Sequence, residues 1–278
     1  MPIAHAIETR RVIKFQDGNI SVTVDSLIQE EPLVINVEWP GGAASHFTTT
    51  MRTPGDDFAL AVGLLATEAD ITSQDISQSR YCVGPGNQQD YNTVTVTLRR
   101  PVSFNTSALR PVSCGWCGAQ DLLQRLAPRI ASNPQPPYHF EEIAHLFDEF
   151  DQRQANFRST GASHAALLKA RSEGSIVGED VGRHNALDKA IGHAILDDIM
   201  LDGAIALLSG RAGSDLVLKA SKVGVTHIAS VSAPTAMAVE LANQAGVTLL
   251  GFVRPGRFNL YSHAEGIIET YDATRVLR

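Results

Sequence analysis

Residues 204–252 read AIALLSGRAGSDLVLKASKVGVTHIASVSAPTAMAVELANQAGVTLLGF. Three short apolar runs, Ala204–Leu208, Thr226–Val231 and Val247–Phe252, are each the length of a buried strand. Between them lie two stretches of helical composition, one from about Ser214 and one starting at Pro234. This alternation predicts an α/β layer built on a partly parallel sheet. Ligands of such sheets tend to bind beyond the carboxyl ends of the strands.

Three loops stand at those predicted carboxyl ends: Ser209-Gly210-Arg211, Ser232-Ala233-Pro234-Thr235 and Arg254-Pro255-Gly256-Arg257. Their guanidinium groups and backbone N–H groups are suitable partners for phosphate. Phenylalanines at both ends of the last loop add surfaces on which an aromatic ring can stack. The composition therefore favours a phosphorylated, aromatic ligand such as a nucleotide, and solvated turns are the alternative. The candidate binding residues here are Ser209, Arg211, Phe252, Val253, Arg254, Pro255, Gly256, Arg257 and Phe258.

The first hundred residues have a different pattern, typical of antiparallel strands. Arg11–Phe15 and Ile20–Val24 flank an Asp-Gly pair, a strong signal for a hairpin turn. Thr93–Leu98 alternates threonine with valine or leucine, as a half-exposed strand does. One helix is predicted shortly after Asp56, which is expected to cap it. This part is therefore expected to be β-rich, with at least one helix packed on it.

Two of the three cysteines, Cys114 and Cys117, lie two residues apart in Ser113-Cys114-Gly115-Trp116-Cys117-Gly118. A single pair of this kind fits half a zinc site, a redox pair, a persulfide carrier or an ordinary loop. A structural zinc site usually needs four ligands, and the His263-Ala264-Glu265 triplet follows the cysteines instead of preceding them as in zinc deaminases. A thioredoxin-like pair is expected near a βαβ pattern, whereas the upstream region reads as antiparallel. Two interpretations of the cysteine pair remain: a thiol that carries sulfur as a persulfide, and an ordinary loop.

A dense polar cluster spans Gly178–Lys189, at the entry to a predicted helix. Taken singly, Glu179 and Asp180 could cap that helix, and Arg183 with Asp188 or Lys189 could form a surface pair that adds little stability. As a dense cluster beside glycines, these residues favour a ligand or interface site about as much as a purely structural role. His164, in Thr160–Ala165, is on its own most simply a core histidine.

Composition narrows the class of protein. The chain has 278 residues, 44% hydrophobic and 19% charged, which is typical of a soluble globular protein. A net charge of −7 argues against broad electrostatic binding to nucleic acid or anionic membranes. Neither a signal-peptide pattern nor a membrane-length apolar run is present, so we expect a cytoplasmic protein whose thiols stay reduced.

Six motifs occur in an order that resembles a known family, the formate dehydrogenase accessory sulfurtransferases or FdhD family. They are Cys114–Gly118, Thr160–Ala165, Glu179–Lys189, Ser209–Arg211, Val231–Thr235 and Gly251–Tyr261. The resemblance implies an α/β (α+β overall) protein with a cytidine-deaminase-like α/β layer. Its expected division is a β-rich part over 1–112, the Cys-x-x-Cys loop with helices and a linker over 113–160, and the α/β part over 161–278. Ala162 and Pro255 depart from the family pattern, and Pro255 would stiffen its loop.

The resemblance also implies a function. A cysteine desulfurase would load sulfur onto the cysteine pair as a persulfide, with Cys114 the persulfide candidate and Cys117 its helper. The sulfur would pass to a bis(molybdopterin guanine dinucleotide) molybdenum cofactor, bound as substrate, that formate dehydrogenase needs. A guanine nucleotide is expected to mimic this cofactor, and His164 and His184 join its candidate binding residues. A cytoplasmic homodimer without a metal site of its own is expected.

Two other readings stay open at this point. One is a non-catalytic chaperone that binds the molybdenum cofactor and delivers it, with cysteines that are structural or protective. The weaker one is a zinc-containing nucleoside or nucleotide hydrolase on a deaminase-like scaffold.

Overall fold

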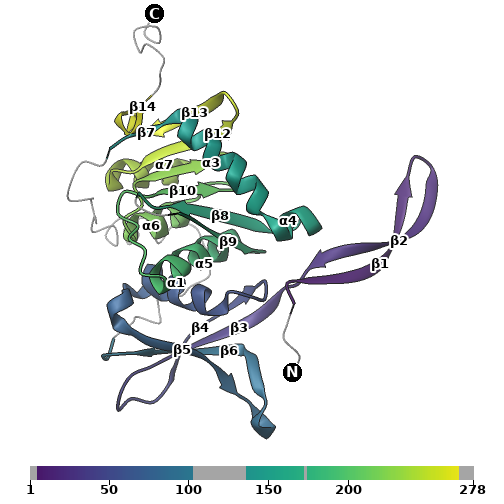
Figure 1. The fold of residues 1–278 in the computed structure, drawn as a ribbon, viewed down its shortest axis with the longest axis vertical. Coiled ribbons are helices and arrows are strands. Elements are labelled where there is room, and N and C mark those ends of the chain that lie inside the picture. The colour runs from purple at the N-terminus through teal and green to yellow at the C-terminus, as the bar shows by residue number, and fades with distance from the viewer. Residues whose placement is uncertain (1–4, 103–135, 172–173, 269–278) are drawn as a thin grey trace, which may run out of the picture. The chain divides into compact units, whose positions relative to one another are not determined.

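The computed structural model describes residues 5–102, 136–171 and 174–268. These residues form two compact units, each made of separate stretches of chain. Unit 1 holds the described parts of Met1–Gly115, Gln154–Ala166 and Val177–Ile199, and unit 2 holds those of Trp116–Arg153, Leu167–Ile176 and Met200–Arg278. Helices and strands are mixed throughout, which confirms the α/β class (Figure 1). The division at residues 112 and 160 stays a prediction.

Unit 1 contains a four-stranded sheet of order β4-β3-β6-β5. Its strands are β3 (Glu31–Glu38), β4 (Ser45–Arg52), β5 (Ile76–Val83) and β6 (Gln89–Leu98). The strand β3 pairs antiparallel with β4 and parallel with β6. Leu33, Ile35 and Val37 alternate along β3 and are fully buried, because every second side chain points to the same face. That face packs on helix α1 (Asp57–Ala69) through Leu60 and Leu65.

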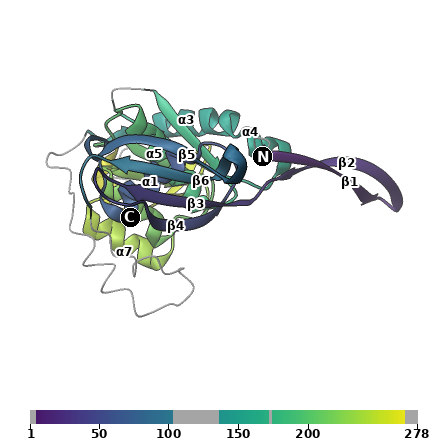
Figure 2. The same ribbon diagram turned by 90° about the horizontal axis from the view of Figure 1, so that it is seen from below.

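The helix α5 (Arg183–Leu196) packs closely against α1 (Figures 1 and 2). Two glycines make this approach possible. A Cβ atom on Gly63 would lie 1.9 Å from the Asp188 carbonyl oxygen, and one on Gly192 would lie 1.8 Å from the Ala59 carbonyl oxygen. No side chain fits at such distances, so the two helix backbones meet only where the residue is glycine.

Helix α1 begins where the sequence predicts it, but its capping differs. Asp56 occupies the N-cap position with φ of 54°, and its side chain makes no capping hydrogen bond. The carboxylate instead lies 3.2 Å from His193 Nε2. This hydrogen bond lowers the pKa of Asp56 and raises the pKa of His193. The prediction that the Asp56 side chain caps α1 is therefore wrong, because the carboxylate bonds to His193 of α5 instead.

Unit 1 also contains a two-stranded ribbon formed by β1 (Ile7–Gln16) and β2 (Asn19–Ile28). The turn residues Asp17 and Gly18 have φ of 51° and 80°, which suits a two-residue turn with both central residues left-handed. The hairpin predicted from the Asp-Gly pair is confirmed. Among the described strands none pairs with the ribbon, and the short helix α4 (Ala155–Thr160) contacts β2.

A six-stranded sheet has the order β13-β12-β11-β10-β8-β9. Its members are β8 (His164–Lys169), β9 (Ser175–Asp180), β10 (Ile205–Leu208), β11 (His227–Ser230), β12 (Thr248–Arg254) and β13 (Arg257–Ser262). In unit 2, β10, β11 and β12 run parallel, and every residue of β10 and β11 is buried. This is the partly parallel sheet that residues 204–252 predict.

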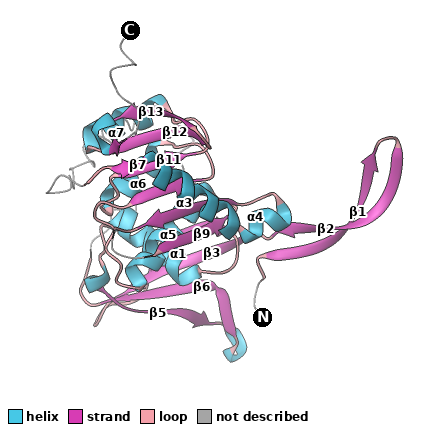
Figure 3. Cartoon of the chain, turned by 45° about the horizontal axis from the view of Figure 1, so that its top comes forward, coloured by secondary structure: helices cyan, strands magenta, loops and turns pink. Residues whose placement is uncertain are grey.

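The helices of unit 2 cover both faces of these strands. They are α3 (Phe140–Arg153), α6 (Ser214–Lys222) and α7 (Ala236–Ala245). The helix α6 packs beside α7, and Figure 2 shows α3 on the opposite side of the strands from α7. Figure 3 shows α3 lying across the strands. Short elements complete the described chain: β7 (Tyr138–His139), β14 (Ile267–Ile268) and the 3₁₀ turns η1 (Ser73–Asp75), η2 (Pro85–Asn87) and η4 (Ala264–Gly266). In the described residues no helix is long and apolar enough to cross a membrane.

Candidate functional site

The three loops singled out in the sequence meet at one edge of unit 2. Because β10, β11 and β12 are parallel, the loops that follow them leave from the same edge of the sheet. An isolated bridge joins Ala212 in the first loop to Pro234 in the second, and Thr235 N donates to Ala212 O over 3.0 Å. Phe252 N donates to Ser232 O over 3.2 Å, which joins the second loop to the third.

The same edge presents the first turns of two helices. The helix α6 begins after Gly213, which has no side chain to cap its N–H groups. The helix α7 begins after Thr235, whose side chain accepts from Ala238 N. Helix N-termini carry partial positive charge and donate hydrogen bonds, so this edge favours an anion. Phosphate is the anion that the sequence predicts.

Gly251 and Phe252 shape the third loop. A Cβ atom on Gly251 would lie 2.9 Å from Pro234 Cδ and 3.0 Å from Tyr261, so glycine allows the second loop to pack here. Phe252 has φ of 53°, which is uncommon for an aromatic residue, and its side chain is 45% exposed. Backbone strain of this kind concentrates at functional sites. An aromatic side chain is thus partly open to solvent in the segment that also carries Arg254 and Arg257.

Arg211, Arg254 and Arg257 are exposed, and none of them forms an ion pair within the described part of the chain. Arg254 is nevertheless anchored, because its Nη1 donates to Val231 O over 2.9 Å and to Val253 O over 2.7 Å. A guanidinium held by neutral carbonyls keeps its full positive charge available to a ligand. Three arginines therefore bring positive charge to these loops on a chain whose net charge is −7, beside one carboxylate, Asp215, in the first turn of α6.

The segment 252–258, which is expected to be a loop, is the tip of a hairpin. Arg254 pairs with Arg257 across a turn at Pro255-Gly256, and Gly256 has φ of 73°. The following strand β13 returns antiparallel to β12, with Phe258 stacked at 4.6 Å on Phe140. Pro255 therefore fits the turn that its ring favours, and Val253 is buried beneath the tip.

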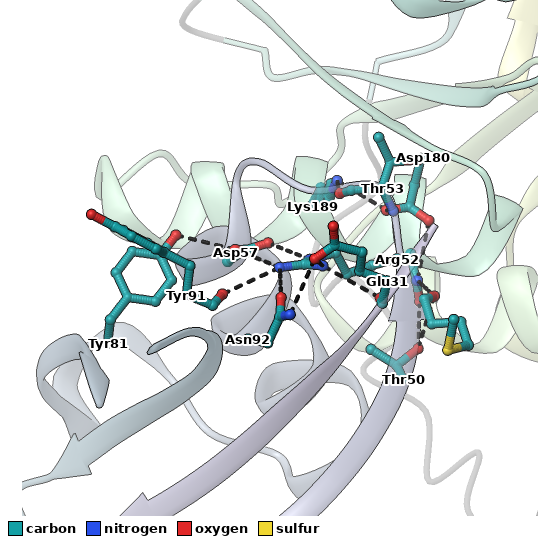
Figure 4. A network of polar contacts seen from close by, with 12 residues as sticks. Glu31, Thr50, Arg52, Thr53, Asp57, Tyr81, Tyr91, Asn92, Asp180 and Lys189 are labelled. Carbon is teal, nitrogen blue, oxygen red and sulfur yellow. Dashed lines mark hydrogen bonds and ion pairs between the residues drawn. The ribbon is translucent and has the colours of Figure 1, made fainter. Parts of the chain in front are cut away.

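The polar cluster at 178–189 is part of the interior of unit 1 (Figure 4). Lys189 Nζ lies 2.9 Å from Asp180 Oδ2 and donates to Thr53 O and Glu179 O over 2.8 and 3.1 Å. Asp180 also accepts from Thr53 N, Gly182 N and Asn185 Nδ2. Lys189 is 1% exposed and Asp180 is 0% exposed. The predicted weak surface pair is wrong for Lys189, which is buried and pairs with Asp180. Asp180 is a buried hydrogen-bond acceptor and not a solvent-exposed helix cap.

Arg52, which no sequence motif singles out, lies in the same interior (Figure 4). Its side chain is fully buried and makes a two-pronged contact with Asp57, at 2.8 Å from Nε and 3.1 Å from Nη2. Nη2 also donates to Asn92 and Tyr91 O, and Nη1 donates to Glu31 O. Tyr81 donates to Asp57, and burial raises the pKa of this tyrosine. A lone arginine in Thr50–Thr53 gives no sequence signal for such a network.

The remaining candidates lie elsewhere. Cys114 and Cys117 lie outside the described residues. His164 begins β8 and His184 lies near the start of α5, both in unit 1, so their sharing a site with Arg254 stays a prediction. Burial lowers the pKa of His164, with a further contribution from the charge of Arg183. His263 and Glu265 pair with each other over 2.8 Å, and in the described segments no group of three metal-binding side chains gathers.

The chain resembles known proteins over most of its length. The model of the FdhD/NarQ family matches residues 28–268. "Sulfur carrier protein FdhD" of Streptomyces coelicolor is 39% identical over 274 residues, which cover 94% of this chain and 95% of that protein. "Sulfur carrier protein FdhD" of Thermoplasma acidophilum is 34% identical over 263 residues, which cover 94% and 93%.

A solved structure shares the fold. The crystal structure of a protein described as a candidate formate dehydrogenase accessory protein from Desulfotalea psychrophila aligns with a TM-score of 0.76. The alignment covers 95% of this chain and 100% of that one, at 23% identity. The family model and the relatives above 30% identity confirm the resemblance drawn from the six motifs: the chain belongs to the FdhD/NarQ family.

Proposed function

We propose that this chain is a cytoplasmic sulfurtransferase that takes sulfur from a cysteine desulfurase and gives it to the molybdenum cofactor of formate dehydrogenase. Membership of a family whose curated relatives are named sulfur carriers supports the first half of the proposal. The observation that carries the second half is the meeting of three loops at the carboxyl edge of unit 2. Their exposed arginines form no ion pair with any residue that the structure describes.

The loading step needs only a thiolate. The sulfur of Cys114 attacks the outer sulfur of the desulfurase persulfide, forms a new S–S bond and breaks the old one. The desulfurase leaves as a thiolate, and Cys114 becomes the persulfide. One sulfur atom moves from the desulfurase to this chain without a net change in oxidation state, so no other oxidant or reductant takes part in this step.

The delivery step needs two electrons, because a persulfide sulfur must leave as sulfide to become a metal ligand. The Cys117 thiolate attacks the Cys114 sulfur, releases HS⁻ and leaves a Cys114–Cys117 disulfide. A cellular thiol reductant then reopens the disulfide. This assigns each cysteine a role, and the reducing cytoplasm supplies the reductant.

The recipient is held by its nucleotide part. A bis(molybdopterin guanine dinucleotide) cofactor carries pyrophosphates, which bind guanidinium groups and helix N-termini. The guanidinium groups come from Arg211, Arg254 and Arg257. The helix N-termini are those of α6 and α7. Phe252 offers its exposed ring to a base. A guanine nucleotide such as GDP is therefore the probe of choice for this edge.

Mass spectrometry of the intact chain tests the loading step. After incubation with a cysteine desulfurase and cysteine, we expect an adduct of about 32 Da, one sulfur atom, that maps to Cys114. The adduct should disappear in Cys114→Ala. It should also accumulate in Cys117→Ala, because release of the sulfur then stops.

Cys82→Ala is the matched control, since Cys82 is half-buried and its sulfur lies 3.2 Å from Thr95 Oγ1. This variant should load sulfur like the parent. An unmodified parent chain that still binds GDP and restores formate dehydrogenase activity would instead favour the cofactor chaperone.

A further inference from the structure

Ser230 places a buried hydroxyl beneath the loops at the carboxyl edge of unit 2. It is the last residue of β11 and is 0% exposed. Its Oγ donates to Gly210 O over 2.5 Å in the first loop and accepts from Ser232 N over 3.0 Å in the second. One side chain therefore fixes both loops to the end of the same strand. None of the six sequence motifs includes this residue.

The bond to Gly210 O also orients the next backbone N–H group. The described chain has no cis peptide bond, so the C=O of Gly210 and the N–H of Arg211 point in opposite directions from one planar unit. Because the carbonyl points to the buried hydroxyl, the N–H of Arg211 points away from it, and Arg211 is exposed. Within the described segments this N–H group forms no hydrogen bond. Arg211 therefore offers a ligand its backbone N–H as well as its guanidinium.

We propose that Ser230 is a positioning residue for the phosphate groups of the nucleotide, and that it acts through the N–H of Arg211. This inference rests on the proposed binding of a nucleotide at this edge. Backbone N–H groups held in one direction beside a helix N-terminus form anion sites. Without the hydroxyl, Gly210 O and Ser232 N lose their partner, and the loops must rearrange or admit water to regain one. The N–H of Arg211 then no longer keeps the direction that a phosphate needs.

The second hydrogen bond of Ser230 extends its influence to the other two loops. Ser232, whose N–H donates to the hydroxyl, uses its own carbonyl to accept from Phe252 N over 3.2 Å in the third loop. Thr235 follows three residues later and caps α7. The three loops therefore depend on one buried oxygen for their relative placement.

Ser262 is a matched control in the same unit. Its Oγ donates to Val247 O over 2.7 Å and accepts from Leu249 N over 3.1 Å, and the residue is 6% exposed. The two serines thus make the same pair of hydrogen bonds at similar burial. The bonds of Ser262 are made at the amino end of β12, whereas the three loops follow the carboxyl ends of their strands. Its loss should weaken the unit without changing the edge.

Titration calorimetry of the full chain with GDP tests the inference. We expect Ser230→Ala to bind GDP about tenfold more weakly than the parent. Ser262→Ala should bind GDP like the parent, although urea denaturation should show a similar loss of stability in both variants. Ser230→Thr keeps the hydroxyl and suits a strand, so it should bind GDP more tightly than Ser230→Ala. In NMR spectra of the ¹⁵N-labelled parent, GDP should move the Arg211 amide resonance, because that N–H gains an acceptor.

Equal GDP affinity of Ser230→Ala and the parent would overturn the inference and leave the proposed function standing. Equal weakening in Ser230→Ala and Ser262→Ala would overturn it too, because the effect would then follow from lost stability. The same holds if Ser230→Thr binds as weakly as Ser230→Ala, or if the Arg211 resonance does not move when the parent binds GDP. This last measurement needs no variant, so it decides even if Ser230→Ala does not fold. A parent chain that does not bind GDP would contradict the proposed cofactor edge, and the inference with it.

Discussion

Arg52 in the interior of unit 1 and Arg254 at the edge of unit 2 carry the same guanidinium in opposite settings. Arg52 is fully buried and its donors meet a carboxylate, an amide and two backbone carbonyls. Arg254 is exposed and donates to two carbonyls from one nitrogen. A guanidinium whose donors are all bonded within the protein stabilises the fold. A guanidinium with unused donors and an uncompensated charge is available to bind a ligand. Substitutions should therefore separate into those that change stability and those that change binding.

Arg52→Ala should give the largest effect. It leaves Asp57 as a buried carboxylate without its ion-pair partner, which costs about 3–5 kcal/mol of unfolding free energy. Urea denaturation measures the loss. The control is Arg80→Ala, whose ion pair with Glu38 is partly exposed and should contribute about 1 kcal/mol or less. Equal losses in the two variants would remove the distinction between interior and surface arginines.

A buried histidine extends the comparison to pH. Burial lowers the pKa of His227 to about 4, and the ring is held by Gly266 O and Thr226 Oγ1, each at 2.9 Å. The unfolded chain takes up the proton near pH 6.5, whereas the folded chain does so near 4. Stability should therefore fall by about 3 kcal/mol between pH 7 and pH 4.

His227→Gln lacks this titration. Urea denaturation at pH 7 and pH 4.5 should show a smaller loss for the variant than for the parent chain. An identical loss in both would assign the acid sensitivity to other groups.

Gly192→Ala tests the packing of α1 on α5. A methyl group 1.8 Å from the Ala59 carbonyl oxygen forces the two helices apart. Such overpacking costs about 1–3 kcal/mol. Gly174→Ala is the control, because nothing lies within 4 Å of its added Cβ atom. Thermal or urea unfolding that ranks the two variants equally would contradict the close approach of the helices.

Arg254→Ala should have the smallest effect on the fold and a clear effect on binding. We expect GDP affinity to fall about tenfold, which corresponds to about 1.4 kcal/mol, with little change in unfolding free energy. Isothermal titration calorimetry measures the affinity. Arg153→Ala removes another exposed arginine of unit 2, one that already pairs with Glu149, and should bind GDP like the parent. Weaker binding in both variants would indicate a general charge effect.

Much of the fold could be predicted because its signals are local. The Asp17-Gly18 turn defines the first hairpin, and the apolar runs of 204–252 define three parallel strands. The loops after those strands follow from the topology alone. Strand β13 falls in a stretch interpreted as a ligand-binding loop because of its arginines and the Pro255-Gly256 turn. Its alternation of Arg257 and Asn259 with Phe258 and Leu260 is that of a half-exposed strand.

The interior network could not be predicted, because its partners are distant in sequence. Thr53 and Asp180 are separated by 127 residues, and Gly192 meets a backbone atom of another helix. No local pattern of residue types indicates such pairs. The Gly178–Lys189 segment is rich in polar residues, yet polarity alone does not distinguish a ligand site from an interior whose polar groups are all hydrogen-bonded. Burial decided between them.

Each unit is assembled from three stretches of chain that alternate along the sequence. A single cut in the polypeptide therefore cannot release either unit as one continuous fragment. A chain truncated after residue 199 would contain every stretch of unit 1 and only part of unit 2, and neither unit could be exchanged between proteins as one continuous segment. The stretches that encode the two units are thus interleaved, so both units are inherited together as parts of one gene.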